Sequence, residues 1–154
     1  MQRYAVAMLC ICWSVVALAD DGSFPYTAFV ESSTASVLSG PGVEFYATER
    51  LKWGTKVEVY RHQAKWAAIR PPAGSFSWVP ASVVEETSNP RLVKVSEPET
   101  FTRVGTQFSD KHTAEYVELK VGESLEVLGR KFMANDSNEV VEWLKIAPPA
   151  GEFR

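Results

Sequence analysis

The chain has 154 residues, with 16 lysines and arginines against 19 aspartates and glutamates and a net charge of −3. This weak acidity is spread along the chain and argues against nucleic-acid binding, which requires a basic patch. The length is enough for one mid-sized domain or for two small ones.

The first nineteen residues have the composition of an export signal. A short positive start ends at Arg3, the run from Tyr4 to Leu18 is almost entirely apolar, and Ala17 and Ala19 are small residues at the two positions that a signal peptidase reads. We predict a signal peptide at residues 1–19, cleaved before Asp20, and export to the periplasm, the cell envelope or the exterior. The alternative is a retained membrane anchor; after cleavage we expect no membrane association.

Both cysteines, Cys10 and Cys12, lie inside this leader. The mature chain would therefore contain no disulfide, no thiol nucleophile and no thiolate metal site. Export without disulfides is more typical of a bacterial envelope protein than of a small animal secreted module.

The phrase Pro-Pro-Ala-Gly occurs at residues 71–74 and again at residues 148–151. The similarity extends upstream, because LKWGTKVEV at 51–59 corresponds to LKVGESLEV at 119–127, and WAAI at 66–69 corresponds to WLKI at 143–146. The chain therefore contains two copies of one unit. The second copy carries nine extra residues around 133–138, whose polar and turn-prone character predicts a hairpin tip.

Apolar and polar residues alternate within each copy, as in residues 56–59 and 123–127, which is the period of a half-buried strand. Glycine and proline separate these short runs at a spacing typical of a small barrel. We predict an all-β protein with two small β-barrels in tandem. Residues 24–84 would form the first barrel, residues 85–90 a polar linker and residues 91–154 the second barrel.

The two copies differ in how they end. After Gly74 the first copy continues through Ser77 to Val79, a predicted closing strand, whereas after Gly151 the second copy has only three more residues. We therefore expect the second barrel to lack its last strand and the chain to belong to a longer protein, with only the first copy able to fold alone. The alternative is that another segment closes the barrel by strand exchange.

The first copy resembles the bacterial Src homology 3 (SH3) domains, a family of small β-barrels in exported cell-envelope proteins. The resemblance rests on four blocks in the correct order, over residues 28–84: ASVLSGPG at 35–42, LKWGTKVEV at 51–59, WAAI at 66–69 and WV at 78–79. The second copy matches only the middle blocks. The position where eukaryotic relatives carry a peptide-gripping tyrosine is Val83, which argues against polyproline recognition.

Aromatic side chains are the candidate ligand-binding residues, because rings can hold sugar faces or a short peptide. They are Phe45, Tyr46, Trp53, Trp66 and Trp78. The alternative is that they form the core of a small domain, which we favour for Phe45 and Trp78; Trp53 and Trp66 follow lysines, which indicates partial exposure.

Nothing in the sequence predicts catalysis. The two histidines, His62 and His112, are isolated and expected at the surface, and no pattern indicates a metal site, a cofactor or a catalytic residue. We therefore expect a protein that is not an enzyme.

The resemblance implies a binding module that attaches a larger protein to cell-wall peptidoglycan, often to its peptide stems, or to an envelope protein. Two alternatives stay open. The copies could be the targeting arm of a wall hydrolase whose catalytic domain lies beyond Arg154, or a structural spacer that binds no glycan.

Overall fold

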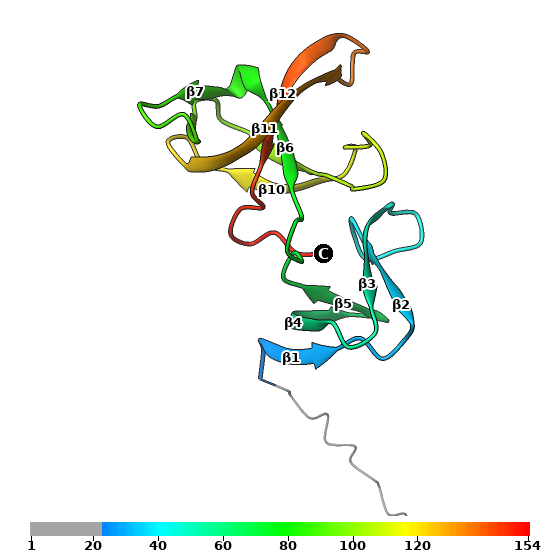
Figure 1. Ribbon diagram of the computed structural model, residues 1–154. Coiled ribbons are helices and arrows are strands. Elements are labelled where there is room, and N and C mark those ends of the chain that lie inside the picture. Colours follow the sequence, from blue (N-terminus) through cyan, green and yellow to red (C-terminus); the bar gives the residue numbers. More distant parts are fainter. Residues whose placement is uncertain (1–22) are drawn as a thin grey trace, which may run out of the picture.

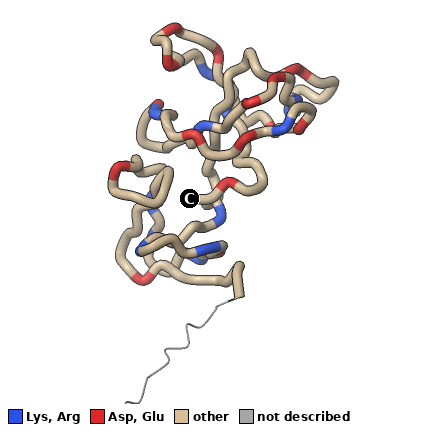
Figure 2. The backbone as a smooth tube through the Cα atoms, turned by 180° about the vertical axis from the view of Figure 1, so that it is seen from behind, with Lys and Arg blue, Asp and Glu red and all other residues tan. Residues whose placement is uncertain are grey.

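The computed structural model describes residues 23–154, so the predicted signal peptide lies outside the described residues. Within this range no helix is long and apolar enough to cross a membrane. Lysine and arginine positions alternate with aspartate and glutamate positions on both halves of the molecule (Figure 2).

The prediction of an all-β protein is confirmed. The described residues contain strands and a single 3-10 turn, η1 (Ala81–Val83). The strands are β1 (Tyr26–Phe29), β2 (Thr34–Leu38), β3 (Ala47–Lys52), β4 (Lys56–Gln63), β5 (Trp66–Ile69), β6 (Ser77–Pro80), β7 (Val84–Glu86), β8 (Leu92–Val95), β9 (Thr100–Val104), β10 (Glu115–Leu119), β11 (Ser124–Ala134) and β12 (Val140–Ile146).

The strands divide into two lobes, one above the other in Figure 1. The first lobe holds a three-stranded sheet in the order β1-β4-β5 and the β2-β3 hairpin; the second lobe holds a seven-stranded sheet in the order β10-β9-β6-β12-β11-β8-β7. These sheets are open, since no pairing among the described strands joins the two edges of one sheet. The interpretation as tandem barrels therefore stays a hypothesis.

Strand β6 belongs to the second lobe, although its sequence is the end of the first copy. It lies antiparallel between β12 and β9, with Ser77 opposite Ile146 and Val79 opposite Leu144. Figure 1 shows β6 leaving the first lobe and entering the upper sheet. The expectation that residues 77–79 close the first copy is therefore wrong, and the second copy receives this strand instead.

The segment after β12 makes the opposite crossing. Residues 147–154 return from the second lobe, and the backbone N–H and carbonyl of Arg154 pair with those of Ile69 at the end of β5, at 2.9 and 2.7 Å. The two Pro-Pro-Ala-Gly phrases are thus the two connections that cross. In each the glycine has a positive φ, 88° at Gly74 and 86° at Gly151, which a residue with a Cβ rarely adopts.

The polar segment predicted as a linker is partly a strand. Glu85 and Glu86 lie in β7, which pairs with β8 and places them opposite Lys94 and Val93. The direction of the chain reverses in the turn at residues 87–91. The predicted hairpin tip is confirmed at residues 135–138, between β11 and β12, whereas Met133 and Ala134 belong to β11.

The exchange leaves the two lobes with unequal cores. The larger buried cluster of the second lobe has seven apolar side chains, from Val79, Val93, Val95, Leu119, Leu125, Leu144 and Ile146. A second cluster in this lobe adds Phe76, Trp78, Met133 and Trp143. The first lobe has three, from Val37, Val59 and Ile69. Each fully buried aliphatic side chain contributes about 1.5–3 kcal/mol, so the free energy of folding is supplied mainly by the second lobe.

The lobes are also joined through the loop that precedes β3. The hydroxyl of Tyr46 donates a hydrogen bond to the carbonyl of Val104 at 2.6 Å, and the Thr106 hydroxyl donates to the carbonyl of Ala47 at 2.8 Å. Burial raises the pKa of Tyr46 above its ordinary value of 10.0, because the phenolate loses hydration there.

We predict that Tyr46→Phe costs about 1 kcal/mol of unfolding free energy at pH 7, because it removes the hydrogen bond to Val104. The raised pKa means that the neutral phenol stabilises the fold below pH 10 and that this stabilisation is lost as the pH rises through the folded-state pKa. Urea unfolding of both proteins at pH 7 and near pH 11 is the measurement. The variant should lose less stability at alkaline pH than the parent; an equal loss would contradict this role.

We predict that neither residues 23–90 nor residues 91–154 unfold cooperatively alone. In the first half β6 and β7 pair only with strands of the second, and in the second half β9 and β10 join the rest of the sheet only through β6. An equimolar mixture of the two fragments should recover a cooperative melt, followed by circular dichroism. A cooperative melt of residues 23–90 alone would instead mean that β6 can close its own lobe.

Candidate ligand-binding surfaces

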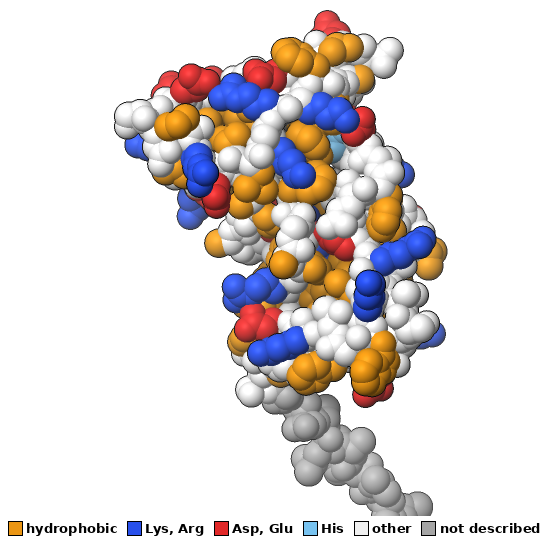
Figure 3. Space-filling view, in the orientation of Figure 1, with side chains coloured by type: hydrophobic (Ala, Val, Ile, Leu, Met, Phe, Trp, Pro, Cys, Tyr) orange, Lys and Arg blue, Asp and Glu red, His pale blue; other side chains and the backbone are white. Residues whose placement is uncertain are grey.

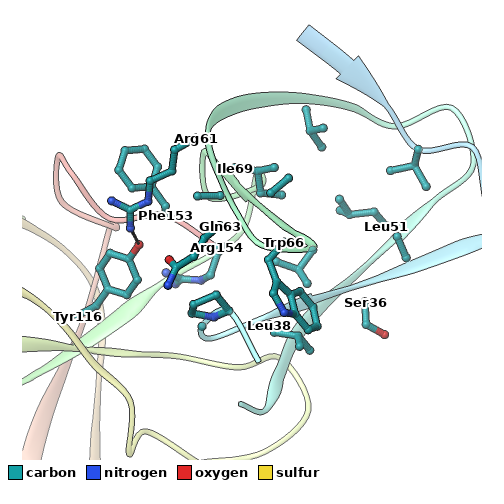
Figure 4. A pocket seen from close by; sticks show the side chains of 18 residues that line it. Ser36, Leu38, Leu51, Arg61, Gln63, Trp66, Ile69, Tyr116, Phe153 and Arg154 are labelled. Atoms are coloured by element: carbon teal, nitrogen blue, oxygen red, sulfur yellow. Dashed lines mark hydrogen bonds between the residues drawn. The ribbon is translucent and has the colours of Figure 1, made fainter. Parts of the chain in front are cut away.

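Two hollows and one buried ion pair are the candidate functional features. The first hollow, here called the β5 groove, lies along β5 in the first lobe and has a volume of about 190 Å³. Its apolar lining includes Val37, Leu38, Leu51, Val57, Trp66 and Ile69. Trp66 and Leu38 lie side by side, and Arg61 of β4 lies near Tyr116 of β10 and Phe153 of the returning C-terminal segment (Figure 4).

The polar rim of the β5 groove joins the lobes. Arg61 donates a hydrogen bond to the hydroxyl of Tyr116 at 3.4 Å, and its guanidinium carbon lies 5.5 Å from the ring centroid of Phe153. The ring of Phe153 also packs against Tyr60, with 4.9 Å between centroids. These contacts hold the returning C-terminal segment against β4.

The buried ion pair lies where the two connections between the lobes, residues 70–76 and 147–154, meet. The guanidinium of Arg154 pairs with the carboxylate of Glu152, and both side chains are fully buried. Arg154 also donates to the carbonyl of Phe76 at 3.1 Å. Glu152 accepts hydrogen bonds from the hydroxyls of Ser77 at 2.6 Å and Thr102 at 3.1 Å. One charge pair therefore contacts β6, β9 and, through the backbone of Arg154, β5.

The second hollow, here called the Lys145 cleft, lies on the second lobe and is wider, with a volume of about 740 Å³. Lysine and arginine side chains lie next to hydrophobic ones on the face of this lobe in Figure 3. The cleft is lined by Gly74, Phe76, Trp78, residues 106–110, residues 129–131 and Lys145.

The chemistry of the Lys145 cleft combines rings with cations. Phe76 and Trp78 pack edge to face, with 5.4 Å between centroids, and the ammonium of Lys145 lies 3.8 Å from the Phe76 centroid. Lys131 pairs with Asp110 at 2.5 Å. Among the described residues Lys145 has no ion pair, so its charge is available to an anionic ligand.

Arg130 at the same cleft is held by two carboxylates. It pairs with Glu86 at 2.8 Å and with Glu142 at 3.5 Å, and the hydrogen bond to Glu86 raises the pKa of its guanidinium further. The cleft thus has one unpaired cation and two paired ones.

The five predicted aromatic residues do not form one surface. Trp66 lines the β5 groove, Trp78 is only 6% exposed but borders the Lys145 cleft, and Trp53 is 72% exposed at the β3–β4 turn. Phe45 is half-buried, with its ring over Gly40, and Tyr46 joins the lobes. Trp78 fits the core interpretation, whereas a ligand role for any of the five stays a prediction.

The two histidines differ from each other. His62 is exposed, as expected, and its ring nitrogen lies 2.7 Å from the hydroxyl of Tyr26. His112 is half-buried and packs edge-on against Trp143, with 4.5 Å between centroids. Within residues 23–154 no three acidic, histidine or cysteine side chains are grouped as a metal site would require.

The sequence interpretation missed Lys145, Phe76, Glu152 and Arg154. Lys145 and Phe76 occupy ordinary strand and loop positions, and only the pairing of β6 with β12 brings them together. For Arg154 a signal existed, because aligning the two Pro-Pro-Ala-Gly phrases places it at the position of Ser77.

Comparison of the chain with protein-family models, with curated proteins and with solved structures gave no match in any of the three. The function proposed below therefore rests on the geometry and on the sequence resemblance.

We predict that Arg154→Met destabilises the protein by about 3–5 kcal/mol, because it leaves the Glu152 carboxylate buried without a cation. Adding Glu152→Gln should restore part of this loss, since the two substitutions act on one interaction. Urea unfolding of both variants is the measurement.

Arg70→Met is the matched control for this pair. Arg70, at the start of the other connection, between β5 and β6, pairs with Glu58 at 2.6 Å, but the arginine side chain is 64% exposed, and water replaces its contacts. This control should change stability little. Equal effects of Arg70→Met and Arg154→Met would contradict the importance of the buried pair.

Proposed function

We propose that this protein is an exported, non-catalytic binding module that attaches its bearer to the cell wall by recognising the carboxylate-bearing peptide stems of peptidoglycan. The observation that carries the proposal is the Lys145 cleft, where an unpaired ammonium lies over an aromatic floor.

The chemistry of the cleft supports an amphipathic anionic ligand. Peptide stems carry free carboxylates and short aliphatic side chains. The ammonium of Lys145 complements the carboxylate, and the faces of Phe76 and Trp78 provide apolar contact area. Arg130 and Lys131 line the same cleft and add to its positive field, although each is paired with a carboxylate.

The finer fold proposal is that each lobe is an SH3-like unit, that the second lobe takes its last strands from the first copy, and that the first lobe lacks the corresponding strands. What supports it is the order of elements after β5. Strand β6, turn η1 and strand β7 follow one another as the closing part of the resembled domain does, and all three contact the second lobe. The sequence resemblance then supplies the wall-binding ligand class.

We predict that Lys145→Gln lowers binding to purified bacterial peptidoglycan about fivefold, which corresponds to losing about 1 kcal/mol of charge-assisted contact. Sedimentation of the protein with insoluble wall material gives the affinity. The matched control is Lys65→Gln, an exposed lysine at the β4–β5 turn of the other lobe, which should bind like the parent.

A third variant, Trp66→Ala, locates the binding surface. Trp66 lies in the β5 groove, away from the cleft, so this variant should also bind like the parent. If Trp66→Ala lowers binding and Lys145→Gln does not, the ligand occupies the groove and the cleft is excluded. If the parent does not sediment with the wall, the spacer interpretation is favoured.

A further inference from the structure

The β5 groove opens directly onto the core of the first lobe. Val37 and Ile69, two of the three buried core residues there, also line the groove, together with Leu51 and Val57. A volume of about 190 Å³ exceeds the roughly 150 Å³ of an apolar cavity that accommodates benzene. The first lobe therefore has apolar space that none of the described residues fills.

The corresponding space in the second lobe is filled by a known segment. WLKI in β12 corresponds to WAAI in β5, and β12 is covered by β6. Val79 of β6 is fully buried in the second-lobe core. Ala81 and Val83 of η1 and Val84 of β7 pack against this core. No described strand covers β5 in the same way.

The register shows how the equivalent segment would enter. In the second lobe, Ser77 of β6 is opposite Ile146 of β12. In the first lobe, the backbone of Arg154 is bonded to that of Ile69. These two pairs are equivalent, because Arg154 aligns with Ser77 and Ile69 aligns with Ile146. In an antiparallel ladder the next bonded position lies two residues along, at Ala67. Ala67 is exposed, and β5 is an edge strand with backbone groups free to pair on this side.

We propose that the β5 groove is a strand-acceptor site, and that its occupant is a strand–turn–strand segment of the chemistry of Trp78–Glu86 joined in the same chain to Arg154. The first residues past Arg154 would run antiparallel to β5. Their second residue, equivalent to Val79, would enter the apolar space beside Ile69 and Leu51. Attachment at Arg154 is favoured because its backbone already makes the first pair of the ladder, so the entropy of bringing the strand to the edge is small.

The proposal concerns the first lobe alone and does not rest on the Lys145 cleft. Its test is the full chain extended after Arg154 by a second copy of the sequence of Trp78–Glu86. The control extension has the same length but carries aspartate at the three positions that copy Val79, Val83 and Val84. A third sample is the unextended chain with the free Trp78–Glu86 peptide added in solution.

The extended chain should melt about 3–6 °C higher than the unextended chain, and exchange of the Ala67 amide hydrogen should slow at least tenfold. The aspartate control should match the unextended chain. Failure of the extension to raise the melting temperature and protect Ala67, or unfolding of the extended chain, would overturn the proposal. Equal protection of Ala67 by the free peptide would also overturn it, in favour of a strand from a separate partner.

Discussion

The buried pair of Glu152 and Arg154 is the contact on which the arrangement of the two lobes depends. It lies where two connections cross, one carrying β6 into the second lobe and the other returning the C-terminal segment to the first. A buried charge pair is stabilised when its remaining donors and acceptors find partners, and here all but the Nε of Arg154 are so placed. Ser77, Thr102 and the carbonyl of Phe76 fill that role, and they come from both connections and from β9. The pair therefore connects both crossing segments to β9.

A second buried carboxylate accepts a hydrogen bond from the other connection, between β5 and β6. Glu49 in β3 is buried and accepts hydrogen bonds from the hydroxyls of Ser75 and Thr48, at 2.6 and 2.5 Å. Ser75 follows Gly74 as Glu152 follows Gly151, so each Pro-Pro-Ala-Gly turn leads into a buried polar contact. The turn at Gly74 thus leads to a contact with β3 of the first lobe, and the turn at Gly151 to contacts with β6 and β9 of the second.

The exchange has unequal consequences for the two lobes. The second lobe gains Val79 and the residues of η1 and β7, which complete its seven-residue buried cluster. The first lobe receives only Phe153 and Arg154 and keeps an open groove beside its three-residue core. The two hollows consequently differ in chemistry: the β5 groove is an apolar edge suited to a strand, and the Lys145 cleft is a cationic surface suited to a carboxylate.

The sequence by itself determined the elements. Alternation at residues 56–59 and 123–127 predicted strands, the paired blocks showed two copies, and the polar insertion marked the β11–β12 turn. These features depend on neighbours in the chain, which the sequence lists in order. Which copy receives β6 was decided only by the tertiary structure, because both β5 and β12 offer a similar edge and the turn at Gly74 fits either. The choice follows from contacts between residues far apart, such as Arg154 with Phe76, and the Lys145 cleft exists only because of that choice.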